Sequence, residues 1–236
     1  MQSYVQCLCE ALAARGHQVT ILCSRHRHDL PAKEIINGVT VVRLGILPFQ
    51  VSRGVIMPGF PHQAWKLIRE HDVVSVHTPL AEAGICGWLA SLADRHVIPV
   101  HHGDLRLPGG AASRWIEHVM LLAFRRLCRR APAVVAYSDD YADHSHYLAV
   151  CRDRVEVIPP PATIPPPDLD NAQSMREHWQ GEGGPLIGFA GRFVDEKRPD
   201  VLIRALDTII ARYPHVRIVF AGDRHMGYEN TWQRHQ

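Results

Sequence analysis

Residues 188–206 read Gly188-Phe-Ala-Gly-Arg-Phe-Val-Asp-Glu-Lys-Arg-Pro-Asp-Val-Leu-Ile-Arg-Ala-Leu206 and indicate a strand, a turn and a helix in direct succession. The apolar run predicts a buried strand over 185–190, and the glycines predict a tight turn that carries Arg192. Apolar residues at helical spacing predict a helix over 199–212, with Pro199 in its first turn. Arg192 and Lys197 thus lie between a strand end and a helix start, where ligands bind in open α/β sheets.

Short apolar strands and helices alternate through the rest of the chain. We predict helices over 3–15, 61–70, 80–94 and 113–130, another helix after Ser138, and strands over 19–23, 39–44, 72–77, 97–101, 133–137, 155–158 and 215–221. Alternation of this kind indicates an α/β fold, with a doubly wound parallel sheet covered by helices on both faces. The pattern opens on a helix, so we expect that the strand before it is missing.

A proline-rich segment interrupts the alternation. Six prolines occur in residues 159–168, and such a run is stiff, extended and short of amide donors. We predict an N-terminal domain over 1–158, a linker over 159–184 and a second domain over 185–236. The second domain holds one βαβ unit, which cannot bury both faces of a sheet, so we expect this domain to be partial.

Composition excludes several classes of protein. The 236 residues are 46% hydrophobic and 21% charged with a net charge of +2, as in a globular protein without bulk nucleic-acid binding. We find no apolar run long enough for a bilayer and no signal peptide, so we expect a cytoplasmic protein. The six cysteines form no Cys-x-x-Cys pair and are expected to be reduced. Dinucleotide, P-loop and serine-hydrolase motifs are absent as well.

Histidines follow two of the predicted strands. His102, Gly103 and Asp104 come after strand 97–101, and His77 ends strand 72–77. A histidine at such a position can bond a sugar hydroxyl, or it can be a loop residue bonded to backbone. His77 could line an acceptor pocket. Although the chain has 16 histidines, no spacing typical of metal ligands occurs, and we expect no metal site.

The helix over 113–130 ends in a basic group formed by Arg125, Arg126, Arg129 and Arg130. Cations at a helix C-terminus interact favourably with the helix dipole. The alternative is peripheral contact with an anionic membrane.

The order of these segments resembles the family 4 glycosyltransferases, which are retaining enzymes of the GT-B fold. The segment "LAARGHQVTIL" at 12–22 is similar to the family's first helix and following strand, and 72–79 and 100–104 are similar to two later strand ends. Residues 187–206 resemble the donor-domain signature, in which Gly-Arg is followed by Glu-Lys, and 218–223 resemble the strand after it.

The resemblance implies a donor site for a nucleotide diphosphate sugar. Arg192 and Lys197 would bind the diphosphate and stabilise the charge that develops as it leaves, with Gly191 and Gly103 on the donor side. His102 would contact the transferred sugar. No cofactor or metal ion is implied, since the two cations would do the electrostatic work.

The N-terminal domain would hold the acceptor, which is a glycan, a lipid or a small molecule, and His77 and Asp104 would lie on the acceptor side. The family's glycine-rich first turn and its later pair of glutamates are not found here, so we expect weak or absent turnover by this chain. One alternative is a non-catalytic nucleotide- or sugar-binding α/β module, and another is a histidine-based metal hydrolase.

Overall fold

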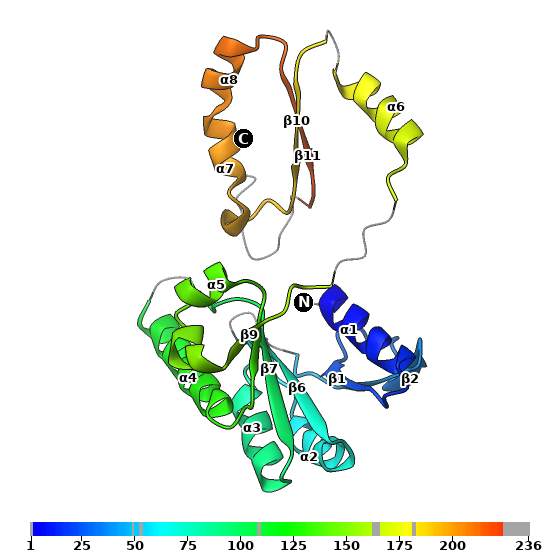
Figure 1. Ribbon diagram of the computed structural model, residues 1–236, viewed down its shortest axis with the longest axis vertical. Helices are drawn as coiled ribbons and strands as arrows, with labels where there is room; N and C mark the ends of the chain where they lie inside the picture. The colour runs from blue at the N-terminus through cyan, green and yellow to red at the C-terminus, as the bar shows by residue number, and fades with distance from the viewer. Residues whose placement is uncertain are drawn as a thin grey trace. The chain divides into compact units, whose positions relative to one another are not determined.

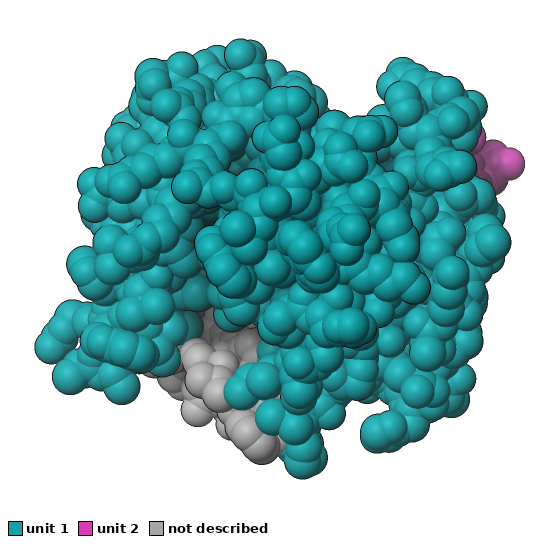
Figure 2. Space-filling view, turned by 90° about the horizontal axis from the view of Figure 1, so that it is seen from below, with its two compact units in different colours: residues 1–163 teal, residues 164–236 magenta. Residues whose placement is uncertain are grey.

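The computed structural model describes residues 2–48, 50–51, 54–107, 110–161, 166–180 and 183–223. The chain divides into two compact units, Met1–Thr163 and Ile164–Gln236 (Figure 2). The boundary falls five residues beyond the predicted end of the first domain at 158. Each unit is described by itself.

Unit 1 is an α/β body whose helices and strands alternate for most of its length (Figure 1). In chain order its elements are α1 (Gln2–Ala14), β1 (Thr20–Ser24), β2 (Lys33–Ile36), β3 (Val39–Leu44), β4 (Gln50–Val51), β5 (Gly54–Val55), α2 (Phe60–Glu70), β6 (Val73–Thr78), α3 (Ala83–Leu92), β7 (His96–His101), α4 (Ala111–Cys128), β8 (Val134–Ala136), α5 (Asp139–His144), the 3₁₀ helices η1 (Leu148–Val150) and η2 (Arg152–Arg154), and β9 (Val155–Val157).

The strands of unit 1 form two main sheets. One has the order β6-β7-β8-β9 with every pair parallel, and the other has the order β1-β3-β2. Among the described residues β1 pairs only with β3 and β6 only with β7, so each strand has one edge without a strand partner. The prediction of a parallel sheet is confirmed for β1 with β3 and for β6 to β9.

Helix α1 links the two sheets because it packs on both. Tyr4 and Leu8 contact β7 and β8 through Val100 and Val135, while Cys9 packs against β3 at Val39. The opposite faces of both sheets are covered by a core of α2, α3 and part of α4, to which Leu22 of β1 and Leu44 of β3 also contribute. Helices therefore cover both faces, as a doubly wound fold requires.

The two hairpins of unit 1 were not predicted. Strand β2 runs antiparallel to β3, and they are joined by Asn37 and Gly38, which have φ values of 49° and 81°. Asn-Gly with two positive φ values is the preferred two-residue hairpin turn, so the sequence did contain this signal. Strand β4 likewise pairs antiparallel with β5, in a stretch where no strand was predicted. The sheet β1-β3-β2 is thus mixed, because its edge strand β2 is antiparallel.

Unit 2 contains α6 (Leu169–Gln180), β10 (Leu186–Ala190), the 3₁₀ helix η3 (Asp195–Lys197), α7 (Pro199–Arg204), α8 (Leu206–Arg212) and β11 (Arg217–Ala221). Strands β10 and β11 are parallel, with Ala190 opposite Ala221. The predicted βαβ unit is present in the described residues, whereas 224–236 of the predicted second domain lie outside them.

Two features of this part of the chain were not predicted. The predicted linker over 159–184 contains α6, a polar helix with no buried residue, so no apolar periodicity revealed it. Asp168 accepts a hydrogen bond from the Asn171 amide at 3.0 Å, which is the capping signal that marks its start. The single helix predicted over 199–212 is divided at Ala205 into α7 and α8.

Candidate functional site

Three polar side chains meet where the parallel strands of unit 1 end. His77 lies in β6, His102 follows β7 and Tyr137 follows β8. Because the carboxyl ends of parallel neighbours meet at one edge, these positions are adjacent, and the register pairs Thr78 with His101. His77 Nδ1 lies 2.8 Å from His102 Nε2, and the Tyr137 hydroxyl bonds His102 Nδ1. Ser75 Oγ lies 3.3 Å from His77 Nε2.

The ring of Tyr4 from α1 packs against this group. Its centroid lies 5.1 Å from that of His102 and 5.7 Å from that of His77, in edge-to-face geometry. The His77 and His102 rings stack at 5.1 Å. Tyr4 is buried, so α1 shields the histidines from water on this side.

Both histidines are held uncharged. Burial lowers the pKa of His77 to about 4. The pKa of His102 is also lowered to about 4, first by burial and then by the neighbouring His77. An imidazolium deprived of water is costly, and none of the contacts of these rings is to a carboxylate. At neutral pH the group is therefore a neutral hydrogen-bonding surface.

His101 and Asp104 form a separate buried cluster. The His101 side chain is fully buried, its Nε2 lies 3.0 Å from Asp104 Oδ1, and its Nδ1 lies 2.9 Å from Thr78 Oγ1. Burial lowers the pKa of His101, although the hydrogen bond to Asp104 opposes this shift. Its ring stacks on Tyr141 and Tyr147. His101 is thus a core residue that fixes the loop after β7.

Asp104 holds that loop to α5 and to the residues that directly follow α5. It accepts hydrogen bonds from Ser145 Oγ at 2.5 Å, the His146 amide at 2.8 Å and the Tyr141 hydroxyl at 3.1 Å, in addition to His101. Burial alone would raise the pKa of Asp104, but these hydrogen bonds outweigh it and lower the pKa. Both carboxylate oxygens are engaged inside the protein. The acceptor-side role predicted for Asp104 stays a prediction beside this observed structural role.

The cations of unit 2 lie on the turn after β10. Gly191 N donates to Ala221 O at 2.9 Å and Phe193 N donates to Asp223 O at 3.0 Å, so this turn is hydrogen bonded to the end of β11. Phe193 is buried against Phe189 and Phe220. The backbone that carries Arg192 and Lys197 is therefore anchored from both sides.

Gly222 lets the two strand ends approach closely. A Cβ atom at this position would lie 2.0 Å from the Gly191 carbonyl oxygen, a separation that atoms do not tolerate. Gly222 directly follows the predicted strand 215–221 but was not among the predicted site residues. Glycine is required here for packing between backbones.

Arg192 and Lys197 both reach solvent. Arg192 Nη2 lies 3.1 Å from Glu196 Oε1, with the side chains 48% and 61% exposed, and such an exposed ion pair contributes little to stability. Lys197 ends η3 with its side chain exposed. Gly191 and Arg192 thus lie on the turn after β10, and Lys197 follows at the end of η3, where its side chain passes close to Gly191.

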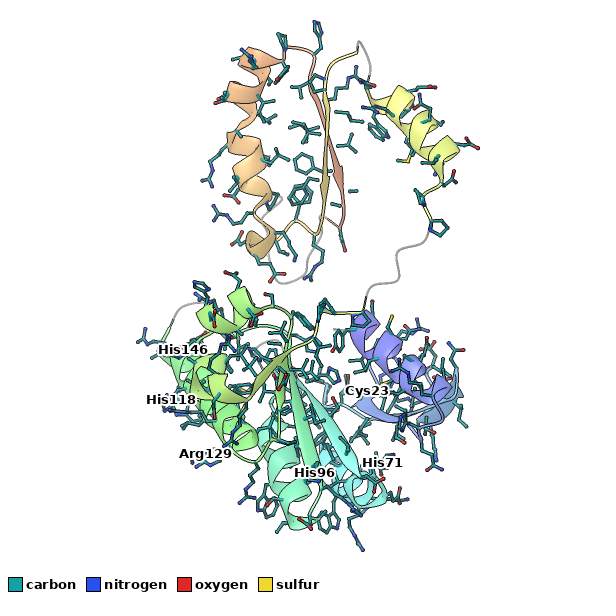
Figure 3. The ribbon with its side chains drawn as sticks, in the orientation of Figure 1. Cys23, His71, His96, His118, Arg129 and His146 are labelled. Atoms are coloured by element: carbon teal, nitrogen blue, oxygen red, sulfur yellow. The ribbon has the colours of Figure 1, made fainter. Side chains whose placement is uncertain are left out.

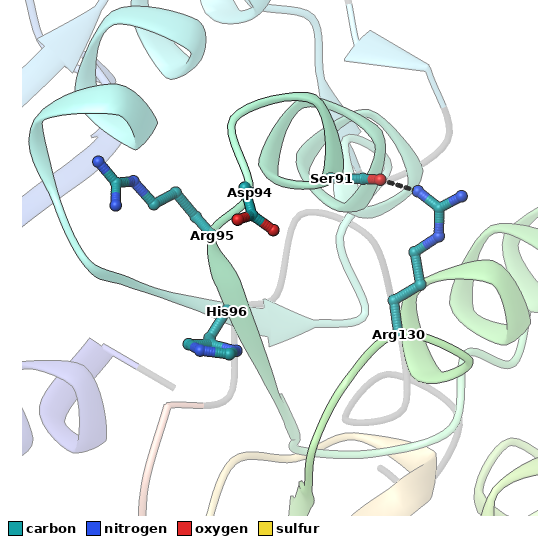
Figure 4. A pocket seen from close by; sticks show the side chains of 5 residues that line it. All are labelled: Ser91, Asp94, Arg95, His96 and Arg130. Carbon is teal, nitrogen blue, oxygen red and sulfur yellow. Dashed lines mark hydrogen bonds between the residues drawn. The ribbon is translucent and has the colours of Figure 1, made fainter.

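A pocket of about 270 Å³ lies elsewhere in unit 1 and is lined by Ser91, Asp94, Arg95, His96 and Arg130 (Figure 4). The pocket lies where β7 begins, at His96, whereas His101 ends the same strand. Five residues of extended strand separate the two ends of β7 by roughly 16 Å. Figure 3 shows His71 and His96 toward that starting edge. The pocket is thus not part of the strand-end site.

Across the described residues, no group of three or more His, Cys, Asp or Glu side chains is arranged to hold a metal ion. No helix in those same ranges is both long and apolar enough to span a bilayer.

The structure adds residues to those predicted for unit 1. Tyr137, Tyr4 and Ser75 contact the predicted histidines directly. Tyr137 could have been found, because it ends the predicted strand 133–137 beside the strand that leads to His102. No local pattern marks Tyr4, which reaches the site only because α1 packs on β7 and β8.

Known proteins resemble this chain over most of its length. A D-inositol 3-phosphate glycosyltransferase of Jonesia denitrificans is 28% identical over 238 residues, which cover 91% of this chain and 55% of the relative. A protein of the same name from Segniliparus rotundus is 25% identical, with 94% of this chain and 53% of the relative covered. The chain thus spans about half the length of the curated relatives it matches.

Two solved structures share the fold. The crystal structure of Anabaena HepE in complex with UDP and glucose superimposes with a TM-score of 0.59 at 19% identity, over 84% of this chain and 52% of HepE. The apo structure of OtsA gives a TM-score of 0.59 at 12% identity, over 96% of this chain and 64% of OtsA. These likenesses confirm the predicted α/β fold of GT-B type.

The sequence profile of Glycosyltransferase Family 4 matches residues 1–163, which is unit 1 in full. Since this match covers more than half of the chain, the chain belongs to Glycosyltransferase Family 4.

Proposed function

We propose that this chain is part of an enzyme that transfers a sugar, of hexosyl type, from a nucleotide diphosphate sugar to an acceptor hydroxyl with retention of configuration. Unit 1 holds the acceptor, which is a glycan, a lipid or a small molecule. Unit 2 binds the diphosphate of the donor without a metal ion. Membership of the family supports the transferase chemistry. The solved complex of HepE with UDP and glucose supports a uridine nucleotide as the first donor to test.

The observation that carries the proposal is the anchored turn after β10. Arg192 and Lys197 extend from it into solvent at the carboxyl ends of two parallel strands. A guanidinium can bind a diphosphate through two parallel hydrogen bonds, and an ammonium adds a point charge beside it. Charge-assisted bonds of this kind contribute roughly 1.5–3 kcal/mol each. Fixed cations also stabilise the charge that grows on a departing diphosphate.

Titration of the chain with UDP and GDP tests this site. We expect Arg192→Ala and Lys197→Ala each to weaken binding by roughly tenfold to a hundredfold, as the loss of one charge-assisted bond implies. Arg212→Ala is the matched control, because Arg212 is an exposed arginine of unit 2 at the end of α8, before β11 begins. Unchanged affinity of Arg192→Ala would exclude the diphosphate role of Arg192. UDP binding without sugar transfer by the intact protein would favour the non-catalytic binding module.

For unit 1 we propose that His102 contacts the transferred sugar and that His77 lies on the acceptor side. Their rings are neutral, and their nitrogens are bonded to Ser75, to Tyr137 and to each other, so a sugar hydroxyl would bond a ring nitrogen by replacing one of these partners. Gly103 next to His102 belongs to the donor side of the same proposal. Weak or absent sugar transfer by this chain and a cytoplasmic location stay predictions.

We also propose peripheral contact between α4 and an anionic membrane. The four arginines of its basic end are exposed, and Trp115 and Val119 of the same helix are exposed apolar residues. Exposed tryptophan beside arginine is favourable at the surface of an anionic bilayer. Co-sedimentation with phosphatidylglycerol vesicles tests this contact. Unchanged sedimentation after replacement of all four arginines by glutamine would exclude this membrane contact.

A further inference from the structure

The histidines of the strand-end site belong to one continuous series of hydrogen bonds. Ser75 Oγ bonds His77 Nε2, His77 Nδ1 bonds His102 Nε2, and His102 Nδ1 bonds the Tyr137 hydroxyl. Each of the four ring nitrogens has one partner within the series. Ser75 at one end is exposed, and Tyr137 at the other end is half-buried.

Counting protons leaves two arrangements of this series. Each neutral imidazole carries one N–H, so it donates through one nitrogen and accepts through the other. All donors must therefore point the same way along the series. Either Tyr137 donates to His102, His102 to His77 and His77 to Ser75, or every bond is reversed. A mixed arrangement would set two lone pairs or two N–H groups against each other.

The chemistry of the end groups favours the first arrangement. A phenol is a more acidic donor than an alcohol, and imidazole nitrogen is a stronger acceptor than phenolic oxygen. Donation from Tyr137 to His102 therefore makes the strongest bond at the buried end, and the weaker bond to Ser75 falls at the exposed end. Both histidines then carry their proton on Nε2.

We propose that Tyr137 is a positioning residue that fixes His102, and through it His77, in the Nε2–H tautomer. With its proton committed to His102, the Tyr137 oxygen keeps free lone pairs and accepts a hydrogen bond from a ligand hydroxyl. The assignment of that ligand as a sugar rests on the function proposed above, whereas the tautomers are a property of the chain without ligand. A sugar that presents an acceptor oxygen to Tyr137 would have to reverse the whole series, so this arrangement favours a donor hydroxyl.

Long-range ¹H–¹⁵N spectra of the chain labelled with ¹⁵N-histidine at pH 7.5 test the proposal. His77→Gln and His102→Gln assign the two signals. We expect one Nε2–H tautomer for both residues, and in Tyr137→Phe we expect averaged His102 nitrogen shifts from two exchanging tautomers. Ser75→Ala should change His77 more than His102, since it removes only the terminal acceptor.

Tyr147→Phe is the matched control. The Tyr147 ring stacks on His101, and within the described residues its buried hydroxyl has no hydrogen-bond partner. Tyr147→Phe should leave the His102 nitrogen signals unchanged. An Nδ1–H tautomer of His102 in the wild type, or an unchanged tautomer in a folded Tyr137→Phe, would overturn the proposal. Unchanged UDP affinity in the Arg192 experiment would overturn the proposed donor site without affecting this outcome, so the two proposals fail separately.

Discussion

Both units place polar side chains at the carboxyl ends of parallel strands, but they orient them by different means. In unit 1 the side chains of His77, His102 and Asp104 are bonded to one another or to neighbouring loops and are largely removed from water. In unit 2 Arg192 and Lys197 are exposed, and the backbone beneath them is held by hydrogen bonds and by the close approach of Gly222.

The difference follows from charge. Neutral imidazoles can be buried when their nitrogens are paired, so side-chain contacts can orient them. Guanidinium and ammonium groups lose too much hydration on burial, so only the backbone that carries them can be fixed. Substitutions in unit 1 should therefore act mainly on stability, and substitutions of the cations in unit 2 should act mainly on ligand binding.

The largest effect is expected for Asp104→Asn. The amide nitrogen would face a backbone N–H donor, and the remaining oxygen is a weaker acceptor for the three other donors. We expect a loss of roughly 2–4 kcal/mol in the free energy of unfolding of unit 1. Amide hydrogen exchange of β7 and α5 measures it without interference from unit 2.

Asp140→Asn is the control for this substitution, since the Asp140 side chain is 92% exposed and its partner within the described residues is His144. It should change stability by no more than about 0.5 kcal/mol. Equal effects of the two substitutions would show that the Asp104 cluster contributes little, and the contrast between the units would be lost.

A smaller effect is expected for Gly222→Ala in unit 2. The added Cβ would overlap the Gly191 carbonyl, so the strand ends must separate at a cost of roughly 2 kcal/mol. Hydrogen exchange of β10 and β11 should accelerate, and UDP affinity should fall because Arg192 moves with the turn. Gly188→Ala in β10 is the control, because nothing lies within 4 Å of its added Cβ. A Gly222→Ala protein with unchanged exchange would contradict the proposed anchoring of the turn.

Acid should destabilise unit 1 more than unit 2. The pKa values of His77 and His102 are about 4 in the folded protein and near the ordinary 6.5 when unfolded. The unfolded chain therefore binds more protons between these values, so stability is complete above pH 6.5 and is lost as pH falls toward 4. With solvent screening of the partly exposed rings, we expect a loss on the order of 1–2 kcal/mol. His101, whose pKa is also lowered, acts in the same direction.

Exchange rates of β6 and β10 at pH 7 and pH 5 measure this difference between the units. In the doubly substituted His77→Gln/His102→Gln chain the pH dependence of β6 should be reduced. A pH dependence of β6 that is the same with and without the two histidines would exclude them as its cause.

The smallest effect is expected for Tyr147→Phe. Its buried hydroxyl has no hydrogen-bond partner within the described part of the chain, so its removal should change stability by no more than about 0.5 kcal/mol. Thermal unfolding measures it. A loss above 1 kcal/mol would show that this hydroxyl takes part in the polar core around Asp104.

Much of this architecture could be read from short segments. Apolar runs predicted most strands to within a residue or two. The helix predicted after Ser138 is α5, and Ser138 caps it by accepting a hydrogen bond from the Tyr141 amide at 3.2 Å. The errors have local reasons as well. Helix α6 has no buried face to create a periodic pattern, and the Asn37-Gly38 turn signal was overlooked.

The amino-acid order alone established the α/β alternation, the proline-rich break and the position of Arg192 and Lys197 between a strand end and a helix start. These are properties of neighbouring residues, and a short connection keeps its two cations close in sequence whatever surrounds it. The partners of the histidines, in contrast, depend on residues far apart in the sequence. His102 meets Tyr137 across 35 positions and Asp104 meets Ser145 across 41, so strand register and helix packing decide those contacts. Such packing makes His101 a core residue and His102, next to it, a site residue, because consecutive side chains point in opposite directions along an extended chain.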